Sequence, residues 1–273
     1  MDFSQNYVQV NDLEVFYHRA GGGDGRSKPP LVLLHGYTDN GLCWARVAHD
    51  LQNDYDVYMP DARGHGRTQG DVQIFSYEQL GADALVFIQA LGLVRPFLFG
   101  HSMGAQTALI VAANAPELVR ALVLEDPPFG HRESAAEQDT EFLQKMADEA
   151  RVFQERPLSE KIAAIRANEP GWAEAEIIPW AESKEEYDPQ IQSPSVRRRM
   201  HQYDWREAAG RVQCPVLLLT AERGIVAPET AVAVTRLIPH CKTVRLPEAG
   251  HCIHRDAYEE TMQVVTDFLA NHQ

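Results

Sequence analysis

The sequence lacks the features that would place the protein in a membrane or on nucleic acid. It has no apolar stretch that approaches the ~20 residues of a membrane span, and no apolar run of signal-peptide length at its N-terminus. Basic residues are in deficit, with 25 Lys and Arg against 39 Asp and Glu and a net charge of −14. Nucleic acid and anionic membrane surfaces repel such a protein, so we expect neither as a partner.

Cysteine and ligand-binding motifs are also scarce. The 273-residue chain has four cysteines without metal-ligand spacing, which are Cys43, Cys214, Cys241 and Cys252. Four cysteines without an export signal are typical of free thiols in a reducing compartment, so we expect a cytoplasmic protein. No metal cluster and no dinucleotide fingerprint occurs in the sequence. We therefore expect no cofactor and no metal, and a small-molecule substrate as partner; the oligomeric state stays open.

A short motif between an apolar run and a helix-like stretch carries most of the functional information. The motif GHSMG (residues 100–104) directly follows FLF (97–99) and directly precedes a helical pattern over 105–114. A serine between glycines at a strand-to-helix turn is typical of a nucleophile elbow, because the sharp reversal leaves no room for flanking side chains. We interpret Ser102 as the nucleophile. The alternative is a Gly-Ser turn without function, which is common for isolated matches of this motif.

An earlier strand predicts the groups that bind the developing negative charge. The apolar run LVLL (31–34) follows two prolines and is followed at once by His35-Gly36-Tyr37. We expect the backbone N–H groups of Tyr37 and Met103 to form an oxyanion hole, because the unpaired amides of a helix start favour negative charge. Taken alone, His35-Gly36 also fits a plain strand-to-loop turn with a packed histidine.

Eleven histidines are available as the base, and position decides among them. His251 follows the strand-like segment 243–246 and precedes an amphipathic helix over 258–270. In hydrolases with a nucleophile elbow, the base lies on the loop after the last strand, in the chain order Ser, Asp or Glu, His. We therefore predict His251 as the base, with His254 as the close competitor. His65 is expected to help a tight loop fold, and we interpret His35 and His101 as neighbours of the motifs rather than as proton carriers.

The orienting acid is missing from its usual position. The loop AERGIVAP (221–228) after the strand-like segment 215–220 has Gly224 where an aspartate commonly stands. Two replacements are possible, either Glu222 or a carboxylate at the end of ALVLED (121–126). Neighbours in a strand face opposite sides, so Glu125 and Asp126 cannot both reach the site. Asp126 lies 24 residues after Ser102, as the acid does in some haloalkane dehalogenases, and is our prediction, with Glu222 second.

Alternating strand and helix patterns predict a mostly parallel, doubly wound α/β sheet. A hairpin over 8–17 comes first; strands at 31–34, 57–59, 97–99 and 121–125 then alternate with helices at 44–51, 77–91 and 105–114. The alternation stops after the sixth strand, where charge-rich helical segments, with 140–155 the clearest, predict an inserted cap. The expected organisation is a core in two parts, 1–126 and 214–273, and a helical cap over 127–213.

Aromatic residues are the candidates for substrate contacts. They are Trp44 in the core and Phe129, Trp180 and Tyr203 in the predicted cap. Aromatic side chains of a lid often line an apolar substrate cavity, although core packing is the more common reason for such a ring. The run Arg197-Arg198-Arg199 fits a solvated helix face, but one arginine turned inward would suit a carboxylate-bearing substrate.

Taken together, four motifs resemble those of the N-formylmaleamate deformylases, serine hydrolases of the α/β-hydrolase superfamily. The motifs are GHSMGA (100–105), LVLEDPP (122–128), AERGIVAP (221–228) and AGH (249–251). The resemblance runs from about Leu31 to the C-terminus, is weaker through the insert, and implies that the acid follows the strand after the elbow helix. It therefore supports a triad of Ser102, Asp126 and His251.

The expected activity is hydrolysis of a small carboxylic ester, lactone or activated amide through an acyl-enzyme. A small formamide is the substrate that the resemblance implies. Two alternatives belong to other classes. One is a lyase such as a hydroxynitrile lyase, which uses this triad for proton transfer, and the other is a ligand receptor without catalysis.

Overall fold

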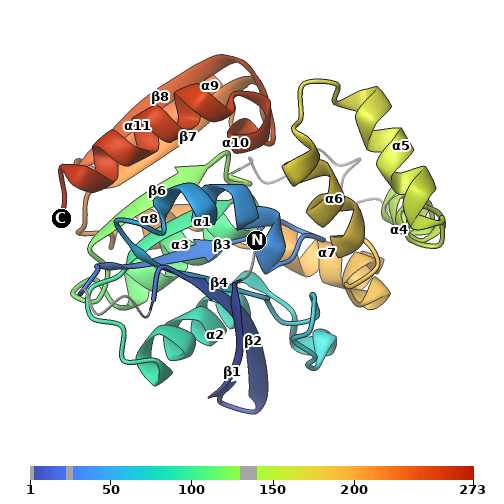
Figure 1. Cartoon of the computed structure of the whole chain (residues 1–273), viewed down its shortest axis with the longest axis horizontal. Helices are drawn as coiled ribbons and strands as arrows, with labels where there is room; N and C mark the ends of the chain where they lie inside the picture. Colours follow the sequence, from blue (N-terminus) through green and yellow to red (C-terminus); the bar gives the residue numbers. More distant parts are fainter. Residues whose placement is uncertain (1–2, 23–26, 130–139) are drawn as a thin grey trace.

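A mostly parallel eight-stranded sheet lies at the centre of the protein (Figure 1), in a computed structural model that describes residues 3–22, 27–129 and 140–273. The strand order is β1-β2-β4-β3-β5-β6-β7-β8. β1 and β2 pair antiparallel, β2 pairs antiparallel with β4, and all other neighbours are parallel. The strands are β1 (Ser4–Val10), β2 (Leu13–Ala20), β3 (Pro30–Leu34), β4 (Asp56–Pro60), β5 (Phe97–His101), β6 (Ala121–Glu125), β7 (Val216–Arg223) and β8 (Cys241–Gly250). The predicted fold class is confirmed.

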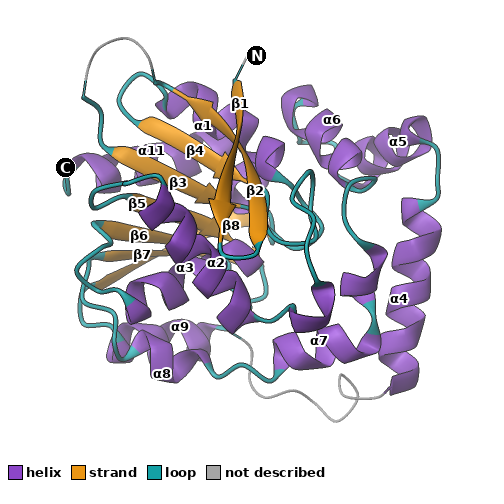
Figure 2. Ribbon diagram, turned by 90° about the horizontal axis from the view of Figure 1, so that it is seen from below, coloured by secondary structure: helices purple, strands orange, loops and turns teal. Residues whose placement is uncertain are grey.

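Helices cover both faces of this sheet because its central strands are apolar on both sides. In β3, Leu31 and Leu33 pack with α1 and α11, whereas Val32 and Leu34 face the opposite cluster with α2, α3, α8 and α9. Successive side chains of a strand point to opposite faces, and Figure 2 shows the two groups of helices on either side of the strands. The helices are α1 (Ala45–Leu51), α2 (Tyr77–Ala90), α3 (Met103–Asn114), α4 (Thr140–Gln154), α5 (Leu158–Asn168), α6 (Glu174–Ser183), α7 (Pro194–His201), α8 (Trp205–Ala209), α9 (Pro228–Leu237), α10 (Ile253–Asp256) and α11 (Tyr258–Ala270).

Two predicted elements differ in detail from those observed. The hairpin is present, with Asn11 in the left-handed region at φ 53°, but β2 continues to Ala20 because it also pairs with β4. The predicted helix over 44–51 is divided into a 3₁₀ helix η1 (Gly41–Trp44) and α1. Its start lies earlier than predicted because Asp61 accepts a hydrogen bond from the Gly41 N–H at 2.8 Å and fixes the turn there.

The register of the parallel strands brings four loops to one edge of the sheet. Leu34 of β3 pairs with Gly100 of β5, and His101 of β5 pairs with Glu125 of β6. Glu125 in turn pairs with Leu219 of β7. The loops after β3, β5, β6 and β7 therefore start side by side at the carboxyl edge, where open α/β sheets bind their ligands.

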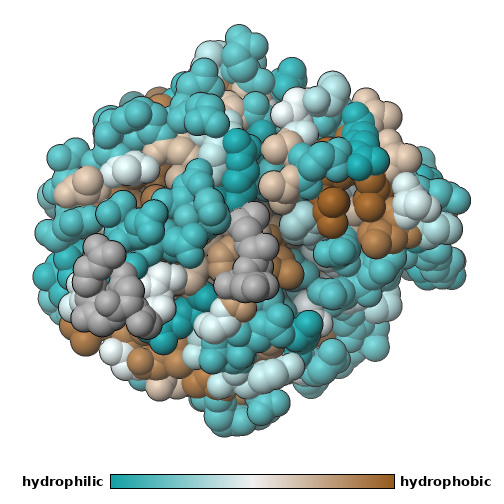
Figure 3. Space-filling view, viewed as in Figure 1, coloured by the Kyte–Doolittle hydropathy of each residue, from teal (hydrophilic) through white to brown (hydrophobic). Residues whose placement is uncertain are grey.

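A helical cap is inserted between β6 and β7. Helices α4, α5 and α6, yellow in Figure 1, lie together beside the sheet, and α6 contacts both η1 and α1. By contrast, α8 packs on α3, and its Trp205 belongs to the core cluster. Figure 3 shows a largely hydrophilic face with a smaller apolar area over the cap. Residues 130–139 lie outside the described residues, and the predicted cap boundaries of 127 and 213 stay a prediction.

Candidate active site

Ser102 stands at a strained turn between β5 and α3. Its backbone lies at φ 50° and ψ −113°, a conformation that costs a non-glycine residue of order 1–3 kcal/mol. A Cβ at Gly100 would lie 2.3 Å from the carbonyl of Gly104, and one at Gly104 would lie 2.0 Å from the carbonyl oxygen of Leu34. The N–H of Ser102 donates to the carbonyl of Glu125 at 2.9 Å. Glycines on both sides are therefore required for this turn, and the sheet edge holds it in place.

The loop after β3 lies against this turn. A Cβ at Gly36 would be 2.7 Å from Nδ1 of His101, so the two segments are in close contact. Within the described residues, the N–H of Tyr37 makes no hydrogen bond. Met103 is the first residue of α3, and the N–H of a first helical residue has no partner inside its helix. The Tyr37 hydroxyl donates to the carbonyl of Ile191 in the cap. Among the described residues, the Tyr37 and Met103 amides without such partners therefore lie on two segments that are in contact at the elbow.

Asp126 and His251 are joined by a short hydrogen bond. Nδ1 of His251 donates to Oδ2 of Asp126 at 2.7 Å, with the proton assigned to Nδ1 because a carboxylate can only accept. The carboxylate also accepts the N–H groups of Ile225 at 2.8 Å and Val226 at 3.1 Å. Asp126 is fully buried, while the His251 side chain is 36% exposed. This bond leaves Nε2 of the imidazole as the free proton acceptor.

Glu125 faces away from Asp126 and holds a different histidine. Its carboxylate accepts from both the N–H and Nδ1 of His254, at 2.9 and 2.8 Å, and both side chains are buried. Burial raises the pKa of Glu125 to about 6 and lowers the pKa of His254 to about 3. Glu222, the second candidate acid, is an exposed partner of Arg245. Neither His254 nor Glu222 belongs to the pair formed by Asp126 and His251.

Three further histidines are buried and neutral around the site. Nε2 of His101 donates to the carbonyl oxygen of His251 at 3.1 Å, so its ring supports the loop of the candidate base. His35 and His65 accept backbone N–H groups at 2.9 and 3.3 Å. Burial lowers the pKa of His35 to about 4 and those of His65 and His101 to about 3. A loop-supporting contact of this kind is what we expected of His65.

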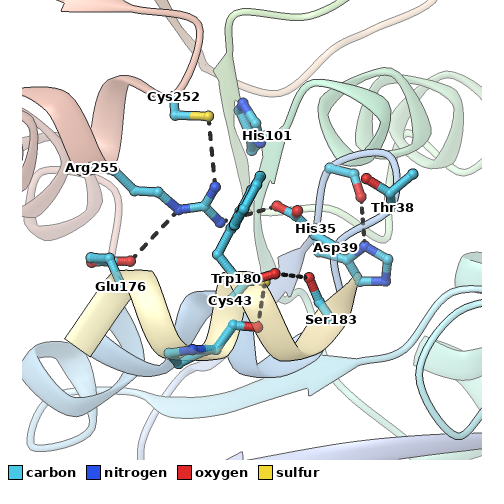
Figure 4. A network of polar contacts seen from close by, with 12 residues as sticks. His35, Thr38, Asp39, Cys43, His101, Glu176, Trp180, Ser183, Cys252 and Arg255 are labelled. Carbon is cyan, nitrogen blue, oxygen red and sulfur yellow. Dashed lines mark hydrogen bonds and ion pairs between the residues drawn. The ribbon is translucent and has the colours of Figure 1, made fainter. Parts of the chain in front are cut away.

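A buried ion cluster that sequence reasoning missed lies next to the Tyr37 loop (Figure 4). Asp39 accepts from Lys184 at 2.5 Å and from Arg255 at 3.0 Å, and Arg255 also lies 3.6 Å from Glu176. Burial opposes the ionisation of Asp39, but the charges of Lys184 and Arg255 outweigh it and hold its pKa well below the ordinary range. The cluster thus joins the loop after β3, the end of α6 and α10 through charged side chains.

Two of the predicted substrate contacts are enclosed by other rings. Trp44 is 1% exposed and lies between Phe99 and His254, with ring centroids 4.6 and 4.4 Å away. Phe129 is fully buried and stacks on Trp205 at 4.6 Å. Their described surroundings are those of core residues, and a substrate contact for either stays a prediction.

The other two aromatic candidates are half-buried in or beside the cap. Trp180 has Nζ of Lys184 4.5 Å from its ring centroid and Trp172 6.1 Å away, edge to face. Tyr203 lies 5.9 Å from Tyr77 and packs against a cluster that includes Met103. These two rings therefore lie near the loops that carry the candidate oxyanion donors.

A pocket of about 640 Å³ opens beside His251. The loop between α5 and α6 forms one wall, and Asp256 ties that loop to the base loop by accepting from Nε1 of Trp172 at 2.6 Å and from the N–H of Gly250 at 2.7 Å. The exposed part of the His251 side chain therefore faces a space between cap and core. The lining residues are Asn168, Glu169, Pro170, Gly171, Trp172, Arg223, Glu248, Gly250, His251, Cys252 and Asp256.

The described residues include neither a metal-binding cluster nor a membrane-spanning helix. Among the described residues, no group of three or more His, Cys, Asp or Glu side chains is arranged to hold a metal ion. No helix in the described ranges combines the length and the apolar character that crossing a membrane requires. The four cysteines are free thiols.

Comparison with known proteins gives the family. A family model described as the alpha/beta hydrolase fold matches residues 29–258. The chain belongs to the α/β-hydrolase family. This α/β hydrolase is 29% identical over 270 residues to N-formylmaleamate deformylase from Pseudomonas putida, with 96% of the chain and 95% of the relative covered. It is 27% identical over 280 residues to 2-(acetamidomethylene)succinate hydrolase from Mesorhizobium japonicum, with 98% and 95% covered.

Solved structures have the same fold. The crystal structure of E-2-(acetamidomethylene)succinate hydrolase superposes with a TM-score of 0.81 at 22% identity, over 98% of this chain and all of that one. The curated relatives are hydrolases, and the chain is accordingly a serine hydrolase of the α/β family that acts on small molecules.

Proposed function

We propose that this α/β hydrolase cleaves a small carboxylic ester, lactone or activated amide through an acyl-enzyme on Ser102. Ser102 is the nucleophile, His251 the general base and Asp126 the orienting acid. The N–H groups of Tyr37 and Met103 bind the oxyanion. The observation that carries the proposal is the 2.7 Å hydrogen bond between His251 and Asp126, at the sheet edge where the elbow serine stands.

Each step follows from the chemistry of these groups. Nε2 of His251 takes the hydroxyl proton as the Ser102 oxygen bonds to the substrate carbonyl, and the two amides stabilise the negative charge on its oxygen. His251 then gives that proton to the departing alcohol or amine. In the second half, water loses a proton to His251 and attacks the acyl carbon; His251 then returns that proton to the departing Ser102 oxygen, and the carboxylic acid is released. Asp126 stabilises the imidazolium in both halves.

Half-buried aromatic rings are our candidates for the acyl-binding surface. Trp180 and Tyr203 come from or near the cap and lie close to the Tyr37 loop, which supports their assignment as substrate contacts. The small-molecule substrate needs no cofactor for this chemistry. The free thiols fit a reducing compartment, and we propose a cytoplasmic location.

The acid assignment gives the test of this function. Asp126→Asn keeps the shape of the side chain but favours the wrong imidazole tautomer, so turnover of a p-nitrophenyl ester is expected to fall by roughly 10⁴-fold. Glu222→Gln is the matched control, because Glu222 is exposed and its ion-pair partner is Arg245 rather than His251. A large loss in the control with activity retained in Asp126→Asn would show that the acid is wrongly placed.

An N-formyl amide carrying a carboxylate is the second candidate substrate. Arg197 of α7 turns inward, with its guanidinium carbon 5.5 Å from the ring centroid of Tyr37. Among the described residues its buried Nε has no hydrogen-bond partner, whereas its Nη2 donates to the side-chain oxygen of Gln192. A carboxylate of the substrate would satisfy this group. The similarity to a deformylase supports the same choice.

Matched substrates distinguish the two candidates. Formamides with and without a carboxylate are compared in the wild type and in Arg197→Met. A carboxylate site predicts that the variant raises KM for the charged formamide and leaves the neutral one unchanged. Arg206→Met, at an exposed residue paired with Asp204, is the control. Equal effects on both formamides would reject the second candidate and leave the ester or lactone activity in place.

A further inference from the structure

Lys184 reaches from the cap into the loop that carries the candidate oxyanion donor. It follows the last residue of α6, and its Nζ donates to the carbonyl oxygen of Thr38 at 3.0 Å and to the Thr38 hydroxyl at 3.1 Å. The same nitrogen donates to Asp39 at 2.5 Å. The side chain is 7% exposed, so these contacts are shielded from water. One cap residue therefore binds the two residues that follow Tyr37.

The backbone of this loop needs such support. Thr38 has φ 65°, in the left-handed region that a β-branched residue rarely adopts. The N–H of Asp39 donates to the carbonyl of Gly36 at 3.1 Å, which closes a turn around Tyr37. The direction of the Tyr37 N–H depends on this turn. The three hydrogen bonds from Lys184 hold Thr38 and Asp39, the last two residues of the turn, in the strained conformation.

Asp39 extends the connection to the candidate base. Its second oxygen accepts from Arg255 of α10, a helix that begins two residues after His251. Figure 4 shows Arg255 lying between Asp39, Glu176 and Cys252. Glu176 belongs to α6, as does the end that carries Lys184. The loop over 36–39, helix α10 next to His251 and cap helix α6 are thus connected through the carboxylate of Asp39.

We propose that Lys184 is a positioning residue of the oxyanion hole. By binding Thr38 and Asp39 it keeps the turn over 36–39 in the conformation that leaves the Tyr37 N–H free for the substrate oxyanion. The oxyanion hole is therefore complete only while α6 is docked on the core. This inference rests on the proposed acyl-enzyme mechanism, and it adds a cap residue to the groups on which the rate depends.

A second buried lysine of the cap gives a matched control. Lys161 of α5 is 1% exposed and pairs with Glu185 at 2.9 Å, and none of its described contacts is with the loop over 36–39. Lys161→Met and Lys184→Met both remove one buried ammonium group from the cap. Asp39 is buried whereas Glu185 is half-exposed, so Lys184→Met is expected to cost more stability, and kcat is compared at a temperature where urea unfolding shows both variants folded. A specific effect on the oxyanion hole should occur in Lys184→Met alone.

The main readout is how the loss divides between kcat and KM. The oxyanion exists only in the transition state, so Lys184→Met is expected to lower kcat for an ester by about 10- to 100-fold and to change KM little. Affinity for a boronic acid, which forms a tetrahedral adduct on the serine, should fall by the same factor as kcat/KM. Affinity for the carboxylic acid product should stay the same. Lys161→Met should change neither kcat nor boronic acid affinity.

Thr38→Gly tests whether the effect passes through the loop. Glycine adopts a positive φ without strain, so the turn depends less on Lys184 in this background. The loss of kcat caused by Lys184→Met is expected to be smaller there than in the wild type. Should Lys184→Met fail to fold, Lys184→Arg keeps the charge for Asp39 but cannot place one nitrogen on the same three oxygens, and it should show the same split in a weaker form.

The outcomes separate this inference from the proposed function. A wild-type protein that turns over no acyl substrate overturns the proposed function. If the wild type is active and Lys184→Met loses no more kcat than Lys161→Met, the proposed function stands and the positioning role of Lys184 is wrong. The same conclusion follows if Lys184→Met raises KM and weakens product binding as much as it lowers kcat.

Discussion

Gly224 and Asp126 compete for the same space. A Cβ at position 224 would lie 2.6 Å from one carboxylate oxygen of Asp126 and 2.7 Å from the other, closer than any side chain can approach. Gly224 is not among the residues with a positive φ, so the obstacle to a side chain there is this contact. The absence of an aspartate in the loop after β7 and the presence of Asp126 after β6 therefore depend on each other.

This relationship predicts the effect of moving the acid. Gly224→Ala should displace the Asp126 carboxylate and lower kcat/KM, although it adds only a single uncharged methyl group. Asp126→Ala should lose nearly all activity. In the double variant Asp126→Ala/Gly224→Asp, the new carboxylate has the vacated space beside His251, and kcat/KM should recover by at least about tenfold over Asp126→Ala. No recovery in a folded double variant would show that the two positions are not equivalent.

The elbow predicts an unequal response of two glycines to alanine. Gly104→Ala places a Cβ 2.0 Å from the carbonyl oxygen of Leu34, whereas a Cβ at Gly171 has no atom within 4 Å. A backbone clash in a packed core costs about 1–3 kcal/mol or more. Urea unfolding should therefore show a clear loss of stability, together with loss of activity, for Gly104→Ala. Wild-type behaviour is expected for Gly171→Ala, and equal stability of the two variants would contradict the geometry.

Buried neutral histidines predict that stability falls as the solution is acidified. Their ordinary pKa is 6.5, and burial lowers it in the folded protein to about 4 for His35 and about 3 for His65, His101 and His254. The unfolded chain therefore binds these protons first. Each group contributes its full stability above pH 6.5 and loses about 1.4 kcal/mol per pH unit as the pH falls toward its folded value.

Two buried acids act in the opposite direction over part of this range. Burial raises the pKa of Glu125 and of Asp61 to about 6, so the folded protein binds these protons first. The stability that each acid contributes is fully present below its ordinary pKa and is lost as the pH rises through about 6. Below pH 6 this effect partly offsets the loss of stability caused by the histidines. The free energy of unfolding should thus decrease from about pH 7 to about pH 5. His65→Gln should flatten this decrease in urea titrations, and His49→Gln, at an exposed residue, should not; equal slopes would contradict the assignment.

The sequence predicts most of the fold and the elbow because their signals are local. Apolar runs mark the buried parallel strands, and the two glycines around Ser102 are required by contacts within a few residues and the adjoining strand end. Asp126 could be predicted from strand alternation together with the absence of an aspartate at position 224, where Gly224 stands. In each case, a short stretch of chain contains the physical constraint.

Contacts between segments far apart in the sequence could not be predicted from such local signals. Lys184 and Asp39 are 145 residues apart, and nothing near Lys184 distinguishes it from the other charged residues of the cap. Arg255 offered a weak signal, since it lies only four residues after His251. Trp44 was a candidate for substrate binding, yet it stacks on His254 in the core, because the exposure of a ring depends on tertiary packing that the sequence pattern does not contain.

Trapping the acyl-enzyme tests the central claim most directly. The protein is mixed with p-nitrophenyl acetate, quenched in acid during turnover and digested, and the peptides are weighed by mass spectrometry. The account predicts one acetyl group on the peptide that contains Ser102, formed at least as fast as turnover, and a loss on the order of 10⁶-fold in Ser102→Ala. A lyase or a receptor would form no such intermediate with turnover. Acetylation of another residue, or turnover that survives in Ser102→Ala, would contradict the account.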